Sequence, residues 1–132
     1  MRTKIESAFI IDDDDIYIFG IKKLIQIKKL CEDLHSFSNG YEALQKLEEL
    51  RNANQAFPEI ILLDINMPIM TGWEFIEHFR NFENDLKTHT KIYMVSSSID
   101  PEDIDRADKL KEIEKYIIKP IDLDTLIEIF TI

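Results

Sequence analysis

The chain has 132 residues and a formal net charge of −10, from 16 basic and 26 acidic side chains. Its 45% hydrophobic content excludes a disordered chain, and its acidic balance argues against nucleic-acid binding, which needs Lys and Arg to neutralise phosphates. The single cysteine, Cys31, excludes an internal disulfide and a cysteine-based zinc site.

The N-terminal residues lack the apolar stretch of a signal peptide. The longest apolar run, residues 16–21, is far shorter than the roughly 18 residues that a membrane helix needs. We therefore expect a cytoplasmic protein that makes no contact with a membrane. The length predicts one domain over residues 1–132, with no output domain.

Short apolar runs alternate with longer helical patterns along the chain. The expected strands are residues 7–11, 34–37, 59–63, 92–95 and 116–118. The expected helices are residues 15–30, 40–52, 72–82, 101–110 and 123–130, and the polar segment 81–91 is expected to be mostly loop. This alternation predicts an α/β fold in which a doubly wound, five-stranded parallel sheet carries five helices on its two faces.

Polar residues that favour helix N-caps precede four of these helices: Asn39, Thr71, Asp100 and Asp122. Glu42 and Glu74 follow Asn39 and Thr71 by three residues, which is the spacing of a capping box. These signals support the expected helix starts.

Charged residues follow three of the expected strands. Asp12 and Asp13 come after 7–11, Asp64 comes after 59–63, and Lys119 comes after 116–118. Ligands of open α/β sheets bind beyond the carboxyl ends of the strands, so these residues are expected to converge. Two carboxylates about 4 Å apart repel by roughly 4 kcal/mol, and oxygen ligands suit Mg²⁺, which is therefore the expected cation.

A simpler interpretation is that the acids at 12–15 only cap the following helix. That interpretation suits Asp14 and Asp15, which enter the helix, better than Asp12 and Asp13, which directly follow the strand.

Together these features resemble the receiver domain of two-component response regulators, over about residues 5–130. The resemblance rests on four motifs in the family's order and spacing: Asp12-Asp13, the run Asp-Ile-Asn-Met-Pro-Ile-Met-Thr-Gly at 64–72, Val95-Ser96-Ser97, and Tyr116-Ile117-Ile118-Lys119-Pro120. It implies a stand-alone receiver with the flavodoxin-like strand order 2-1-3-4-5.

The resemblance also implies a role for each matching residue. Asp64 would be the phosphoacceptor, and Lys119 and Ser96 would bind phosphoryl oxygens. The Mg²⁺ ligands would be Asp12, Asp13, Asp64 and the backbone carbonyl of Asn66. Ser96 and Tyr116 would form the switch that responds to phosphorylation, whereas Asn66 and Ser98 would tune the phosphate lifetime.

Three site assignments have alternatives. Ser96, Ser97 and Ser98 are adjacent, so the register of the hydroxyl could slip by one residue. Tyr116 could be a half-buried aromatic that never switches. Trp73 could serve core packing or contact a kinase.

The implied phosphodonor is a histidine kinase or a histidine phosphotransfer protein. A downstream protein, which the sequence does not identify, is expected to bind the face formed by residues 101–110, 116–118 and 123–130. The sequence leaves open whether the chain is a monomer or a phosphorylation-dependent homodimer. It also leaves open the isomer of the Lys119–Pro120 bond, which the family suggests is cis.

Two other functions compete with a phosphorylation-dependent switch. One is a receiver-like interaction module that works without phosphorylation. The other is an aspartate-nucleophile phosphatase of the haloacid dehalogenase type, which has a second acid two residues after its nucleophile. Asn66 occupies that place here, so we expect no enzyme beyond intrinsic autophosphorylation and dephosphorylation.

Overall fold

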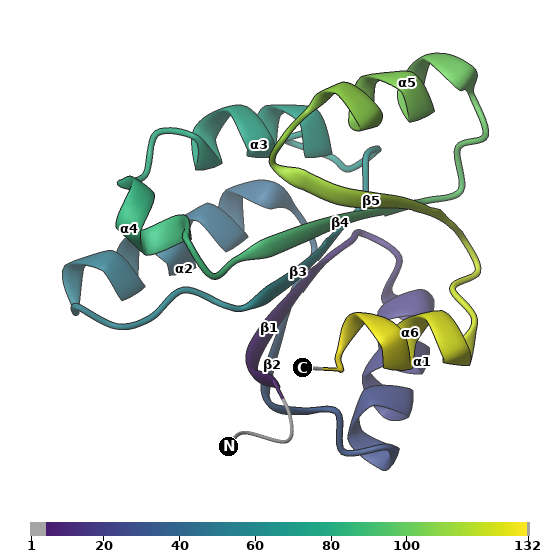
Figure 1. The fold of residues 1–132 in the computed structure, drawn as a ribbon, viewed down its shortest axis with the longest axis horizontal. Helices are drawn as coiled ribbons and strands as arrows, with labels where there is room; N and C mark the ends of the chain where they lie inside the picture. Colours follow the sequence, from purple (N-terminus) through teal and green to yellow (C-terminus); the bar gives the residue numbers. More distant parts are fainter. Residues whose placement is uncertain (1–4, 132) are drawn as a thin grey trace.

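Five apolar runs form a parallel sheet in the order β2-β1-β3-β4-β5 in a computed structural model that describes residues 5–131 (Figure 1). The strands are β1 (Ile5–Ile11), β2 (Cys31–Phe37), β3 (Ile60–Leu63), β4 (Lys91–Ser96) and β5 (Ile113–Ile118). The α/β fold and the flavodoxin-like strand order expected from the sequence are confirmed.

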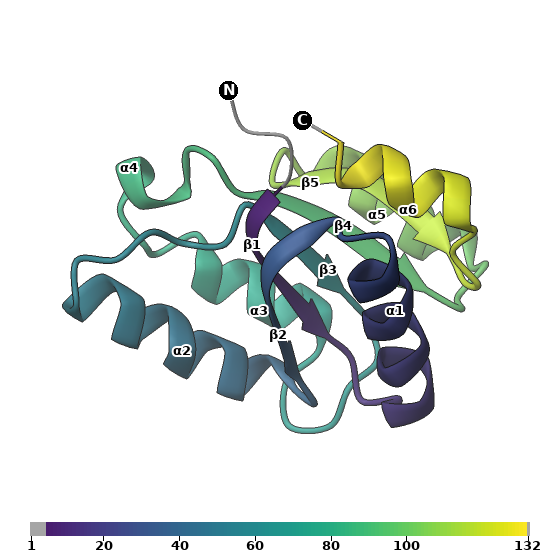
Figure 2. The ribbon, with the colours of Figure 1, turned by 90° about the horizontal axis from the view of Figure 1, so that it is seen from below.

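Helices cover both faces of this sheet. The helices are α1 (Asp15–Ile27), α2 (Gly40–Asn52), α3 (Gly72–Phe79), α4 (Asn84–Lys87), α5 (Pro101–Lys109) and α6 (Leu123–Ile129). Helices α1 and α6 lie side by side on one face, and α2, α3 and α5 lie on the other (Figures 1 and 2). The sheet is therefore doubly wound, as predicted.

Successive side chains of the central strands point to opposite faces of the sheet, so the hydrophobic core forms two layers. All four residues of β3 are buried because helices cover both faces of that strand. Ile61 and Leu63 point to the layer under α2 and α3, whereas Ile60 and Leu62 point to the layer under α1 and α6. This two-sided burial fixes the strand register, since a slip by one residue would exchange the layers.

Side chains cap the helices where the sequence predicted. The side chains of Asn39, Thr71, Asp100 and Asp122 each accept a hydrogen bond from a backbone N–H in the first turn of α2, α3, α5 and α6. The capping box is complete only at Thr71. At α2 the Glu42 carboxylate accepts from the Asn39 side-chain amide instead of from its backbone N–H.

The prediction of five helices was wrong, because the described residues contain six. The additional helix is the single turn α4, within the segment expected to be loop. Leu86 packs against the core from this turn, and Lys87 Nζ donates to the Arg80 carbonyl. One apolar residue in a polar stretch gives no helical period, so the sequence carries little signal for α4.

Several element ends also differ from the prediction. Helix α1 ends at Ile27 instead of residue 30 because Lys29 takes a left-handed conformation, with φ of 54°. Strands β2 and β5 begin three residues earlier than expected, at Cys31 and Ile113, because their first residues pair with Ile5 and Ile92 on neighbouring strands.

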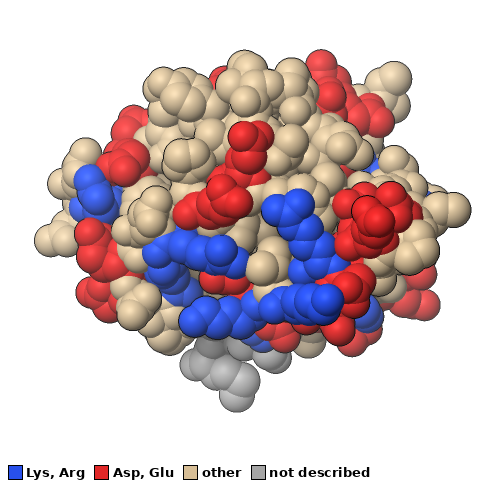
Figure 3. Space-filling model, turned by 90° about the horizontal axis from the view of Figure 1, so that it is seen from above, with Lys and Arg blue, Asp and Glu red and all other residues tan. Residues whose placement is uncertain are grey.

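None of the helices within residues 5–131 is long and apolar enough to cross a membrane. On the face that carries α3 and α5, Lys and Arg side chains lie among Asp and Glu side chains (Figure 3).

Candidate functional site

The sheet register brings the polar residues after the strands to one edge. Ile11 pairs with Leu63, so Asp12 and Asp64 leave neighbouring strands at the same level. The Asp64 N–H donates to the Ile11 carbonyl at 3.0 Å, which holds the two chain segments together. On the other side, the Lys119 N–H donates to the Ser96 carbonyl at 2.9 Å. Residues far apart in sequence thus meet at one edge, as predicted.

Three carboxylates form a compact acidic cluster there. Asp12, Asp13 and Asp64 each offer an oxygen atom, and these atoms lie within 4.8 Å of one another. Asp12 and Asp64 are buried, whereas Asp13 is exposed. The Lys119 ammonium lies 2.7 Å from Asp12 Oδ2 and 3.9 Å from Asp64 Oδ2, so the lysine neutralises only part of the cluster.

Burial dominates the electrostatics of these groups. It raises the pKa of Asp64 to about 6, and repulsion from Asp12 adds to this effect while Lys119 opposes it. Burial also raises the pKa of Asp12, although hydrogen bonds from Lys119 and from the Asp14 backbone oppose the rise. Both carboxylates therefore favour a bound cation, which would replace the solvation that burial removes.

The donor set fits a hard divalent cation. It consists of carboxylate oxygens only, and one of the three acids is open to solvent, which leaves room for the waters that Mg²⁺ retains. Asn66 lies exposed on the loop that follows Asp64. The use of its backbone carbonyl as a ligand stays a prediction.

Asp14 has the capping role that the sequence suggested. Its Oδ1 accepts hydrogen bonds from the N–H groups of Ile16 and Tyr17, both at 3.1 Å. The Asp14 N–H in turn donates to Asp12 Oδ1 at 2.9 Å. The capping acid therefore also helps to orient an acid of the cluster.

The three adjacent serines at the end of β4 differ in burial. Ser96 is 1% exposed at the end of β4, whereas Ser97 is exposed. Ser96 Oγ accepts a hydrogen bond from the Ser98 N–H at 3.2 Å. Ser96 is thus the hydroxyl turned into the protein at this edge of the sheet.

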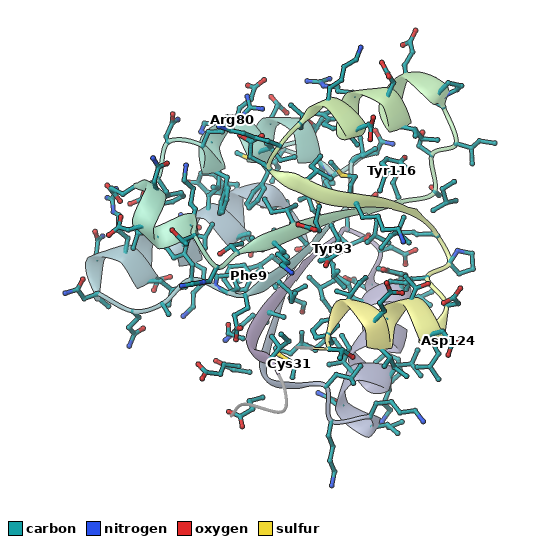
Figure 4. All side chains as sticks on the ribbon, viewed as in Figure 1. Phe9, Cys31, Arg80, Tyr93, Tyr116 and Asp124 are labelled. Carbon is teal, nitrogen blue, oxygen red and sulfur yellow. The ribbon has the colours of Figure 1, made fainter. Side chains whose placement is uncertain are left out.

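A hydrogen bond connects Tyr116 to the loop that follows β4. It lies on the side of the sheet toward α5, whereas Tyr93 lies on the side toward α6 (Figure 4). The Tyr116 hydroxyl donates to the Ser98 carbonyl at 2.8 Å, and Ser98 Oγ donates to Asp103 at 2.7 Å. Ser98 therefore joins β4, β5 and α5, a connection that the sequence did not reveal.

Sequence reasoning also missed Tyr17, whose ring centroid lies 4.3 Å from the Lys119 ammonium. Burial raises the pKa of the Tyr17 hydroxyl, and the Asp12 and Asp64 carboxylates raise it further. The available signal was its position in the first turn of a helix that starts just after the acid pair, one turn before the apolar Ile21.

Gly72 and Trp73 support the site by packing. A Cβ atom at Gly72 would overlap the Asp64 carbonyl oxygen and lie 3.1 Å from Ile65 Cα, so the glycine permits close approach of two backbones. Trp73 is buried and its ring faces the Arg106 guanidinium at 4.5 Å. Its position agrees with the packing interpretation. The Lys119–Pro120 bond is cis.

The sequence matches the family described as "Response regulator receiver domain" over residues 8–131. It is 30% identical over 120 residues to the transcriptional regulatory protein LnrK of Bacillus subtilis, covering 90% of this chain and 49% of that protein. It is 29% identical over 122 residues to the nitrate/nitrite response regulator NarL of Escherichia coli, covering 92% of this chain and 51% of that protein. The chain thus spans about half the length of these two regulators.

Solved structures show the same relationship. A two-component response regulator from Cytophaga hutchinsonii superposes with a TM-score of 0.85 at 36% identity, covering 96% of this chain and 94% of the other. A response regulator receiver protein from Dyadobacter fermentans gives a TM-score of 0.78 at 28% identity, with 93% of each chain covered. With the fold, the converging strand ends and these matches in agreement, the chain belongs to the response regulator receiver domain family.

Proposed function

We propose that this receiver domain is a phosphorylation-dependent signalling switch whose phosphoacceptor is Asp64. The observation that carries the proposal is the acidic cluster of Asp12, Asp13 and Asp64 with Lys119 beside it. A buried carboxylate flanked by an ammonium and by other acids suits a nucleophile that attacks phosphorus.

In the proposed reaction an Asp64 carboxylate oxygen attacks the phosphorus of a phosphohistidine on a histidine kinase or a phosphotransfer protein. The new O–P bond forms as the P–N bond breaks, and the electron pair of the P–N bond returns to the imidazole, which takes up a proton. Lys119 stabilises the charge that spreads over the equatorial phosphoryl oxygens. The Lys119 ammonium is placed for this role, because it lies 3.9 Å from Asp64 Oδ2 while it contacts Asp12 Oδ2 at 2.7 Å.

Asp12, Asp13, Asp64 and the Asn66 carbonyl would hold Mg²⁺, which supplies charge neutralisation between the acids and the phosphoryl group. Asp64 would contribute to holding the metal while its carboxylate attacks phosphorus. The Ser96 hydroxyl donates its proton to a phosphoryl oxygen, and its oxygen, which accepts from the Ser98 N–H, links a movement of Ser96 to Ser98.

A movement of Ser96 would displace Ser98, which binds its hydroxyl oxygen. Because Ser98 contacts Tyr116 and Asp103, a shift at the end of β4 changes both β5 and α5. We propose that a downstream protein reads this change on the face formed by α5, β5 and α6, where Ile104 is 37% exposed and Ile118 is 45% exposed. Phosphorylation thereby biases a two-state packing of this face.

The proposal is tested by incubating the protein with acetyl phosphate and Mg²⁺ and measuring its intact mass. The parent protein is expected to gain ~80 Da, the mass of a phosphoryl group, and Asp64→Asn is expected to gain nothing. An unchanged parent mass with several phosphodonors would favour an interaction module that works without phosphorylation. Steady turnover of an aryl phosphate would favour the phosphatase.

A further inference from the structure

Tyr17 buries a hydroxyl that has no hydrogen-bond partner. Within residues 5–131, its oxygen is the single buried side-chain nitrogen or oxygen in that condition. An unsatisfied buried polar group costs free energy, and such groups in native proteins need an explanation. Phenylalanine would fill the same space without this cost, so the hydroxyl of Tyr17 calls for a role of its own.

The position of Tyr17 points to the acidic cluster. Its ring lies over the Lys119 ammonium, 4.3 Å from the centroid, and this ammonium contacts both Asp12 and Asp64. A cation held against an aromatic face is stabilised by the ring electrons. Tyr17 is therefore in contact with the group proposed to stabilise phosphoryl charge.

The start of α1 holds Tyr17 in this place. Asp14 caps the helix and binds the Tyr17 N–H. Two nearby apolar side chains point outward, with Ile16 86% and Phe19 67% exposed, whereas Ile18 and Ile21 are buried. Tyr17 lies on the inward face of α1, one turn before the buried Ile21, so packing explains the place of its ring but not the hydroxyl without a partner at its tip.

We propose that Tyr17 is a further phosphoryl-binding residue: its hydroxyl donates a hydrogen bond to an oxygen of the phosphoryl group on Asp64, while its ring holds Lys119 over the site. This inference rests on the proposed phosphorylation of Asp64. A phosphoryl group brings three strongly accepting oxygens to the site, and a hydrogen bond to a charged acceptor is among the stronger ones.

The test uses Tyr17→Phe, which keeps the ring over Lys119 and removes only the hydroxyl. Binding of beryllium fluoride, a phosphoryl mimic, is measured by calorimetry in the presence of Mg²⁺. The variant is expected to bind about tenfold more weakly than the parent, the loss of one hydrogen bond to a charged group. The metal-free and fluoride-free variant is expected to melt at a higher temperature, because the unsatisfied oxygen is gone.

Tyr93→Phe is the matched control. Tyr93 is buried in the layer under α1 and α6. Burial raises the pKa of its hydroxyl, and Glu114 and Glu128, which are not part of the acidic cluster, raise it further. This control should bind beryllium fluoride as the parent does. If Tyr17→Phe also retains parent affinity, the role of Tyr17 is refuted while the proposed function stands. If the parent itself neither binds the mimic nor accepts phosphate, both proposals fail.

Discussion

At the scale of single residues, Asp64 is in an environment that disfavours its charge. Its pKa rises from 3.8 to about 6, first because it is buried and second because Asp12 is near. The folded state therefore binds a proton more tightly at this group than the unfolded state does. The stability that this proton contributes is fully present below about pH 4 and is lost as the pH rises through about 6.

The resulting prediction concerns the metal-free protein. Between pH 4 and 7 the parent should lose, relative to Asp64→Asn, at most about 2 kcal/mol of unfolding free energy, because solvent partly screens this carboxylate. Urea unfolding at a series of pH values in the presence of a chelator measures this difference. Parallel pH profiles for the two proteins would contradict the assigned environment of Asp64.

Ile69 is strained on the loop between β3 and α3. It has a φ of 71°, in the left-handed region that β-branched residues avoid, and its side chain is 77% exposed. Ile69→Asn should raise the unfolding free energy by about 1 kcal/mol, because asparagine tolerates this conformation and little apolar burial is lost.

Chemical denaturation measures the unfolding free energies of Ile69→Asn and of a control, Ile99→Asn. The comparison separates the relief of backbone strain from the effect of replacing an exposed isoleucine by asparagine. Ile99 is 72% exposed, and its φ is not positive. The control should change stability by less than about 0.5 kcal/mol. Equal effects at the two positions would show that the left-handed backbone stores no strain.

At the scale of elements, the start of α3 packs against the end of β3. The Gly72 N–H donates to the Ile65 carbonyl at 2.8 Å, and a Cβ at Gly72 would meet the Asp64 backbone. Gly72→Ala should therefore lower the unfolding free energy by about 2 kcal/mol. It should also slow the proposed phosphorylation, because the backbone of Asp64 must move.

Gly20→Ala is the contrasting substitution. No atom lies within 4 Å of a Cβ at Gly20, which is exposed in the middle of α1. Alanine is a better helix former, so this variant should gain about 0.5–1 kcal/mol and keep its phosphorylation rate. Thermal melts and timed mass measurements compare the two variants. A tolerated alanine at 72 would contradict the close packing described here.

The sequence predicted the ends of an element best where a capping residue preceded a regular pattern of apolar residues. Helix α2 begins and ends at the predicted residues, with Asn39 as its cap. Strand β2 was predicted too short because its first residues, Cys31, Glu32 and Asp33, include two exposed acids. An edge strand pairs on one side only, so backbone pairing can continue without an apolar pattern.

The site was predictable in outline and not in its supporting contacts. Asp12, Asp64 and Lys119 follow apolar strands, and parallel pairing alone brings them to one edge. The contact of Tyr17 with Lys119, and the hydrogen bond between Tyr116 and Ser98, depend on side-chain directions from separate elements. No spacing in the sequence encodes those directions.

At the scale of the whole molecule, the acidic cluster would couple the proposed metal binding to folding. Because the three carboxylates come together only in the folded chain, Mg²⁺ should bind the native state preferentially. At ten times its dissociation constant, Mg²⁺ should add about 1.4 kcal/mol of stability, which for a domain of this size raises the melting temperature by about 5 °C.

Differential scanning calorimetry with and without Mg²⁺ measures this rise, and Asp13→Ala serves as the control. Asp13 is exposed, so the metal-free melting temperature of the variant should change little while the Mg²⁺ effect is lost. A variant that keeps the full Mg²⁺ effect would remove Asp13 from the proposed ligands.

We propose that strand ends from across the chain build one site, in which a single carboxylate, that of Asp64, accepts the phosphoryl group. Borohydride reduces an aspartyl phosphate to homoserine, so reduction after treatment with acetyl phosphate and Mg²⁺ marks the acceptor permanently. Peptide mass mapping should then find homoserine at position 64 and unchanged aspartate at positions 12 and 13. Homoserine at position 12 or 13, or at no position in a protein that has gained the phosphoryl mass, would contradict the account.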